Sequence, residues 1–229
     1  MVQRFIVPFH GDGRGGFLRQ EINSDVPSGP RRVAACDFDR DGTPDLVVTH
    51  YNSDCITAWR GDGSGRFELM QSISSGGETP YHLELTDLNR DGHPDIVVGH
   101  RGATDNVTLL FGRGGFEFSL ARSICAAESD DSHVVEYEIR DVSVTDLNGD
   151  GEREVVAACR RANVVLVWQL RHQSGEIDLQ PAGRIELPGK GPRALASKDF
   201  NGDGRNELAL ALGTTGEVIL IGATQELNE

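Results

Sequence analysis

Residues 37–48 read DFDRDGTPDLVV, and this pattern returns three more times along the chain. The other copies are DLNRDGHPDIVV at 87–98, DLNGDGEREVVA at 146–157 and DFNGDGRNELAL at 199–210. The starts of the four copies are 50, 59 and 53 residues apart, which is the length of a unit of four short strands. Self-similarity at this spacing is the main evidence for the fold class.

Strand signals recur in phase with the copies. A strand-like stretch precedes the first acidic loop at 32–36, and two more follow it at 46–49 and 55–59. Gly-rich turns at 61–65 and 112–115 each lead to a phenylalanine and predict hairpins, because glycine readily adopts a positive φ. No segment has a 3.6-residue period of helical length. The sequence therefore predicts an all-β protein: a β-propeller, or an arc of a propeller, of about four four-stranded blades, with the acidic loops between first and second strands.

We expect one domain over residues 1–229, with repeats that start near 31, 81, 140 and 193. Residues 1–30 are expected to complete a blade, because 4–17 match the third strand, turn and fourth strand of a unit. A closed ring of four blades and an arc of a longer propeller both agree with this arrangement. A β-sandwich is the alternative, but it does not explain a loop that recurs at blade-length spacing.

Composition excludes several functions. The 229 residues carry 36 acidic against 22 basic side chains, a formal charge of −14 that disfavours nonspecific nucleic-acid binding and adhesion to anionic membranes. No apolar run is long enough to span a bilayer, and no secretory signal opens the chain. The four cysteines have no CxxC spacing, which argues against zinc ribbons and thioredoxin-type chemistry. Their number allows two disulfides, although buried free thiols are the favoured reading.

The acidic loops carry the pattern of a hard-cation site. Asp or Asn stands at loop positions 1, 3 and 5, Gly at 6, and Asp or Glu at 9. Calcium takes six to eight oxygen ligands, and alternate residues of a tight turn can direct carboxylates at one centre. The apolar residue at position 12 excludes an EF-hand, which needs a glutamate there. Four Ca²⁺ ions would change the formal charge from −14 to about −6.

The run Asp-x-Asp/Asn-x-Asp-Gly-x-x-Asp/Glu followed by Leu-Val-Val resembles the FG-GAP/VCBS repeats. Those repeats build calcium-binding β-propellers, including the head of integrin α subunits and many secreted bacterial and fungal proteins. The resemblance implies up to four Ca²⁺ ions, one in each loop, with the position-7 residue contributing its backbone carbonyl. The implied ligands are Asp37, Asp39, Asp41, Thr43, Asp45, Asp87, Asn89, Asp91, His93, Asp95, Asp146, Asn148, Asp150, Glu152, Glu154, Asp199, Asn201, Asp203, Arg205 and Glu207. Two departures are that four loops are present where seven blades are common, and that the FG-GAP tripeptide is not preserved.

The resemblance also implies a function. We expect a non-catalytic scaffold that binds or adheres to a protein or carbohydrate partner through a disc face. The expected location is extracellular or periplasmic. Neither a nucleophile elbow, a zinc-protease motif, a phosphate loop nor a dinucleotide fingerprint is present, so we do not expect an enzyme. A carbohydrate-binding lectin and the propeller domain of an enzyme similar to a polysaccharide lyase are the alternatives.

Three features remain outside the loops. Six residues before the loops stand Arg31, Tyr81, Arg140 and Arg193, which could converge at the central channel as a cationic pocket for carboxylates such as acidic sugars, or could each pair with an adjacent acidic loop. His50 and His100 share a position and form either a second ligand site or, as favoured, buried strand ends. The longer spacing between the second and third copies predicts a charged insertion over 124–135.

Overall fold

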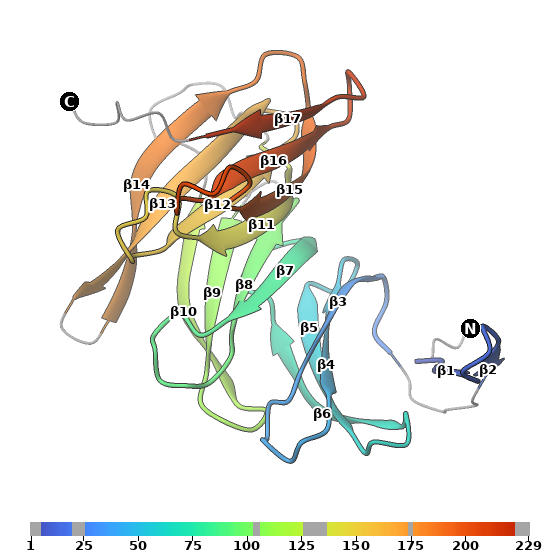
Figure 1. Cartoon of the computed structure of the whole chain (residues 1–229). Coiled ribbons are helices and arrows are strands. Elements are labelled where there is room, and N and C mark those ends of the chain that lie inside the picture. Colours follow the sequence, from blue (N-terminus) through green and yellow to red (C-terminus); the bar gives the residue numbers. More distant parts are fainter. Residues whose placement is uncertain (1–5, 20–25, 103–105, 126–136, 174–175, 223–229) are drawn as a thin grey trace.

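The computed structural model describes residues 6–19, 26–102, 106–125, 137–173 and 176–222. These residues form 17 strands and no helix, in antiparallel sheets that follow one another like the blades of a propeller (Figure 1). The predicted all-β fold and its blade arrangement are confirmed. No helix long and apolar enough to cross a membrane occurs in these ranges.

Each blade is a meander in which neighbouring strands are consecutive in sequence. Blade 1 consists of β3 (Pro30–Cys36), β4 (Asp45–His50), β5 (Cys55–Gly61) and β6 (Phe67–Ser74). Blade 2 consists of β7 (Pro80–Thr86), β8 (Asp95–His100), β9 (Asn106–Gly112) and β10 (Phe118–Cys125). Blade 3 consists of β11 (Ile139–Thr145), β12 (Glu154–Cys159), β13 (Val164–Gln173) and β14 (Glu176–Glu186). Blade 4 consists of β15 (Pro192–Lys198), β16 (Glu207–Leu212) and β17 (Val218–Ile221).

The two ends of the chain differ from the complete blades. Blade 4 has three strands among the described residues, and the last of them is β17. Near the other end, β1 (Phe9–Gly11) and β2 (Phe17–Arg19) pair only with each other and lie apart from the blades (Figure 1). That this hairpin completes a blade stays a prediction.

The first strands β3, β7, β11 and β15 are neighbours in space and line the inner side of the arc. Each acidic loop joins a first strand to a second strand, as predicted. A first strand of seven residues is about 20 Å long, because an extended residue rises about 3.3 Å. The acidic loops and the start of the first strands therefore lie at opposite ends of the blades.

Alternating residues of one strand serve two different blade interfaces. In β8, Ile96 and Val98 belong to the apolar cluster shared with blade 1, whereas Val97 belongs to the cluster shared with blade 3. The third cluster joins blades 3 and 4, and there Val156 faces blade 4 from β12. Since successive side chains of a strand point to opposite faces, a second strand between two blades must be apolar at every position. This explains the unbroken Val- and Ile-rich runs after the loops.

Repeat-equivalent positions show where this packing stops. Leu83 and Val142 are each 1% exposed, but their equivalent in blade 1, Val33, is 55% exposed. Phe38 is 2% exposed beneath Phe118 of the next blade, and its equivalent in blade 4, Phe200, is 49% exposed. The outer faces of blades 1 and 4 thus carry the residue types of a blade interface without a neighbouring blade among the described residues.

The four cysteines carry free thiols. Cys159 is buried, Cys36 and Cys55 are half-buried, and Cys125 is exposed near the end of β10. The reading of free thiols is confirmed, although only one of the four is fully buried.

The equivalent pair Leu83 and Val33 tests the origin of stability. We expect Leu83→Ala to lower the free energy of unfolding by about 2–5 kcal/mol, because it leaves a cavity between blades 1 and 2. Val33→Ala should change it by less than about 0.5 kcal/mol, because Val33 is exposed. Urea unfolding of both variants measures the difference, and equal losses would contradict this account of blade packing.

Candidate functional site: an acidic loop face and an arginine-lined channel

Hydrogen bonds from the backbone shape every acidic loop in the same way. In loop 1 (37–45), Asp37 accepts the N–H groups of Asp41 and Gly42 at 3.1 and 2.9 Å, and Asp39 accepts that of Asp41 at 3.3 Å. Asp41 in turn accepts the N–H of Thr43 at 2.8 Å. Loop 2 (87–95) repeats these bonds. Loops 3 (146–154) and 4 (199–207) repeat them with one difference: the position-1 aspartate accepts the N–H groups of positions 4 and 6 instead of 5 and 6. These bonds fix where the carboxylate and amide oxygens point.

The acidic residue at position 9 has a further role that the sequence analysis did not foresee. Asp45 is buried and accepts the N–H of Phe38 at 2.8 Å and that of Gly61, at the end of β5, at 2.9 Å. A Cβ at Gly61 would overlap the carbonyl oxygen of Pro44, so only glycine brings the third strand this close. Asp95 makes the same bonds in blade 2, and burial raises its pKa to about 6.

The structure brings three carboxylates together in two of the loops. Oxygen atoms of Asp37, Asp39 and Asp45, and likewise of Asp199, Asp203 and Glu207, lie within 4.8 Å of one another. Every side-chain donor is an oxygen, which is the donor set of a hard cation such as Ca²⁺ and not of zinc or copper. In loops 2, 3 and 4 the position-3 amides of Asn89, Asn148 and Asn201 donate to the position-5 aspartates. The residues present therefore fit calcium, and the carboxylates cluster most closely in loops 1 and 4.

Arginine side chains connect successive loops. Arg40 donates to the carbonyl of Gly92 in loop 2, and Arg90 donates to the carbonyl of Gly151 in loop 3 at 3.3 Å. Both arginines have positive φ values, 61° and 62°, at the loop position that is glycine in loops 3 and 4. Such a backbone is costly for a long side chain, and the contact with the next loop accounts for its presence here.

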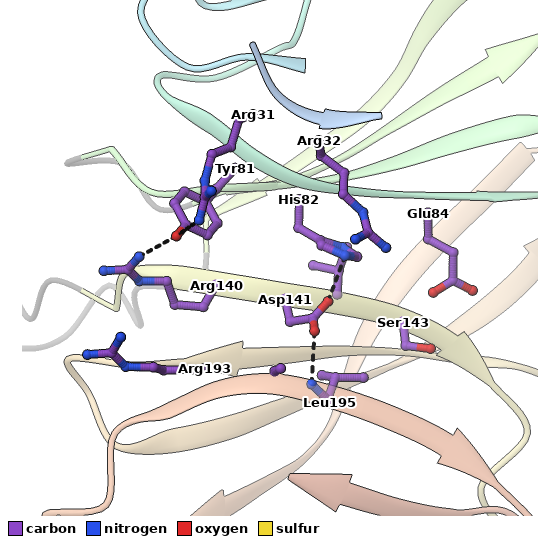
Figure 2. A pocket seen from close by; sticks show the side chains of 12 residues that line it. Arg31, Arg32, Tyr81, His82, Glu84, Arg140, Asp141, Ser143, Arg193 and Leu195 are labelled. Atoms are coloured by element: carbon purple, nitrogen blue, oxygen red, sulfur yellow. Dashed lines mark hydrogen bonds and ion pairs between the residues drawn. The ribbon is translucent and has the colours of Figure 1, made fainter. Parts of the chain in front are cut away.

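A pocket of about 640 Å³ opens at the other end of the blades, between the first strands of all four blades. Arg31, Tyr81, Arg140 and Arg193, here called the channel mouth, all line it (Figure 2). The structure thus brings together the four residues that the repeat alignment singled out. None of the described ion pairs links a mouth arginine to an acidic loop, so the reading in which they neutralise those loops does not hold for the described residues.

Tyr81 organises two of the mouth arginines. The guanidinium of Arg31 lies 4.0 Å from the centre of the Tyr81 ring and donates to its hydroxyl. Arg140 donates to the same hydroxyl at 2.6 Å and lies 4.7 Å from the ring centre. Burial alone would raise the pKa of Tyr81, but the hydrogen bond from Arg31 and the charge of Arg140 hold it below its usual value. The two cations are held in place by one aromatic ring.

Glu138 is the residue that sequence analysis missed. It is 3% exposed and binds Arg101, Arg140 at 2.6 Å and Arg160 at 2.9 Å. Its φ is 55°, whereas the equivalent positions of blades 1 and 4 are Gly29 and Gly191. The signal available in the sequence was an acidic residue, eight residues before a loop, at a repeat position that is glycine in blades 1 and 4. Its carboxylate positions arginines from two blades beside the mouth.

A second layer lies deeper in the channel. His82 and Asp141, both largely buried, meet with Nε2 3.0 Å from Oδ1, and Glu84 and Ser143 lie beside them (Figure 2). Burial, with the charges of Arg32 and Arg31, lowers the pKa of His82 to about 4, and burial raises that of Asp141 to about 6. At neutral pH the imidazole is therefore neutral and donates from Nε2. Its Nδ1 has no hydrogen-bond partner among the described residues.

The equivalent histidines His50 and His100 do not form a second ligand site. The Nε2 atom of His50 lies 2.7 Å from the hydroxyl of Thr57, and that of His100 lies 3.1 Å from the hydroxyl of Thr108. Both rings are buried, in agreement with the favoured reading of buried strand ends. The charged insertion expected over 124–135 lies outside the described residues from position 126 onward.

The fold is a β-propeller arrangement of repeats, each with an acidic loop between its first and second strands. The FG-GAP-like repeat model matches residues 37–98 and 146–210, more than half of the chain. The chain belongs to the FG-GAP-like repeat family. No curated protein sequence matches it.

Solved structures with this fold have low sequence identity to the chain. A protein from Lactobacillus plantarum superposes with a TM-score of 0.62 at 14% identity, over 93% of this chain and 60% of that one. BBS1N, in complex with ARL6DN, gives 0.54 at 14% identity, over 86% and 57%. An Agrocybe aegerita lectin that recognises non-reducing terminal N-acetylglucosamine gives 0.52 at 15% identity, over 86% and 53%. The chain spans about 60% or less of each of these proteins.

The lowered pKa of His82 can be tested by titration. We expect the His82 ring to stay neutral down to about pH 5, because its pKa is about 4. A pKa lowered by folding stabilises the protein above the unfolded value near 6.5, and that contribution is lost as the pH falls towards 4. Imidazole NMR shifts, assigned with His82→Gln, measure this, and a midpoint near 6.5 would contradict the buried pairing.

Proposed function

We propose that this chain is a calcium-stabilised, non-catalytic binding module that presents its channel mouth to an anionic group of a protein or glycan partner. The observation that carries the proposal is the convergence of Arg31, Tyr81, Arg140 and Arg193 on one concave site. A concentration of arginine is unusual in a protein with a formal charge of −14. Arginine binds carboxylates and phosphates through paired hydrogen bonds, which makes such a site selective for anions.

In this proposal calcium binds in the acidic loops, at the end of the blades opposite to the channel mouth. The carboxylates and amides at positions 1, 3, 5 and 9 of each loop would hold the ion, with the position-7 carbonyl. Bound calcium would supply positive charge among groups that otherwise repel one another, and so would stabilise the turn between the first and second strands. The ion is a structural element here and takes no part in recognition at the mouth.

The setting we propose is extracellular or periplasmic, with a role in binding or adhesion. Extracellular calcium modules work at about 10⁻⁴–10⁻³ M calcium, which suits exposed turns of this kind. Structures with the same fold include a protein in a complex and a lectin, and both kinds of partner are compatible with an anion site.

An enzyme similar to a polysaccharide lyase is the second candidate, and one observation favours it. His82 lines the pocket with a neutral ring whose Nδ1 is buried without a partner among the described residues, and Asp141 fixes its tautomer. Turnover of uronate polymers can be measured by the absorbance of the unsaturated product. If the protein is non-catalytic, we expect no such product. Product formation that His82→Gln abolishes would establish the enzyme instead.

Calcium binding is tested by thermal melting. Adding calcium to chelator-treated protein should raise Tm by several degrees, since a ligand of the folded state stabilises it by about 2.7 kcal/mol at one hundred times Kd. Asp37→Asn should reduce the rise. Asp62→Asn should not, because Asp62 bonds its turn in a similar way but stands outside the acidic loops. No rise, together with an empty metal analysis, would refute calcium binding.

Anion recognition is tested with two immobilised probes, polyglutamate and polygalacturonate. We expect binding of at least one, weakened about tenfold by Arg193→Gln, because a charge-assisted hydrogen bond contributes about 1.5–3 kcal/mol. Arg184→Gln is the matched control, since Arg184 pairs with Glu186 on β14, away from the pocket. Equal binding by the two variants would place recognition elsewhere.

A further inference from the structure

We propose that the channel is a two-layer site for an acidic sugar residue, whose carboxylate binds at the mouth and whose hydroxyl groups bind the deeper layer. This inference rests on the proposed function, because it assigns a ligand class to the same pocket. Its carrying observation is the order of the two layers along the first strands. Arg31, Tyr81, Arg140 and Arg193 lie at the mouth, and the acceptors of His82, Asp141 and Glu84 lie deeper, with Arg32 beside them (Figure 2).

The outer layer contains hydrogen-bond donors that have no partner among the described residues. Arg193 makes no hydrogen bond or ion pair with any described residue, and it extends in the same direction as Arg140 in Figure 2. Its side chain lies against Gly213, where a Cβ would collide with it, so the backbone there leaves room for the arginine. The Nε of Arg140 is buried without a partner. A ligand carboxylate at this position would satisfy groups that the protein leaves unpaired.

The inner layer offers acceptors. The Nδ1 atom of His82 is buried without a partner, and the carboxylates of Asp141 and Glu84 lie beside it. Asp141 uses one oxygen for His82 and the other for the N–H of Leu195, and Glu84 accepts the N–H of Val144 at 3.2 Å. Acceptors of this kind need donors from the ligand. Sugar hydroxyls are such donors, and they can also accept from Arg32 in the same layer, whereas a second anionic group would face the carboxylates of Asp141 and Glu84.

Size and surface chemistry favour a sugar over a protein partner. The pocket volume of about 640 Å³ falls within the range of about 300–1,000 Å³ that is typical of small-ligand sites. Arg31 covers a face of the Tyr81 ring, so the site would recognise a sugar through polar contacts and not by stacking on that face. A carboxylate combined with several hydroxyls, as in a uronic acid, matches both layers.

The experiment compares ligands by calorimetry on the full chain. A galacturonate trisaccharide is titrated against its carboxyl-reduced neutral counterpart, inorganic phosphate and a glutamate-rich peptide. We expect the uronate to bind at least tenfold more tightly than each of the other three. Arg193→Gln should weaken uronate binding about tenfold, and Glu84→Gln should weaken it several-fold while leaving or improving phosphate binding. Arg184→Gln controls for surface charge, and melting temperatures confirm that each variant is folded.

The outcomes separate this inference from the proposed function. Peptide or phosphate binding equal to that of the uronate, lost in Arg193→Gln and unchanged in Glu84→Gln, would overturn the sugar assignment and retain the anion site. Equal binding of the uronate and its neutral counterpart would also overturn it. No binding of any anion would refute both. If Glu84→Gln lowers stability, Ser143→Ala replaces it as the inner-layer variant, with the same expected result.

Discussion

The hydrogen bonds of the carboxylate at loop position 9 hold each acidic loop to its blade, and the arrangement of the strands follows from them. In blade 1 its two oxygens accept N–H groups from the loop behind the first strand and from the end of the third strand, and Asp45 itself begins the second. One buried side chain thereby joins three strands. A carboxylate in such a place requires its hydrogen bonds, because an unsatisfied buried charge is costly. The repeat preserves this residue type as Asp or Glu in all four blades.

The acidic loop follows the end of the first strand, so fixing the loop also fixes the position of the start of that strand. The starts of β3, β7, β11 and β15 meet at the channel because their blades pack through alternate side chains of the second strands. The arginines of the mouth are therefore brought together by apolar packing some distance away. Tyr81 then orders two of them, whose guanidinium groups contact its ring. Glu138 holds Arg140, one of four arginines that pair with its buried carboxylate.

Much of this architecture is readable from the sequence because it repeats. The alignment places the acidic loops between strands and puts the four mouth residues at one position, and the structure brings those four to one pocket. The contact between His82 and Asp141 joins two blades and occurs once, so no repeat signal announces it. The same holds for Glu138, whose arginine partners come from blades 2 and 3. The outer faces of blades 1 and 4, which no described blade covers, could not be predicted from the sequence either, since Val33 and Leu83 occupy the same repeat position and differ only in the neighbouring blade.

The placement of charge gives the molecule a polarity along the channel axis. Fourteen loop carboxylates gather at one end of the blades, while arginines surround the pocket at the other. Such a distribution acts as an electric dipole whose positive end is the mouth, within a molecule that is negative overall. An approaching anion is repelled by most of the surface and guided towards one opening. Capture at the mouth is then a process in which added salt slows the encounter more than it speeds the release.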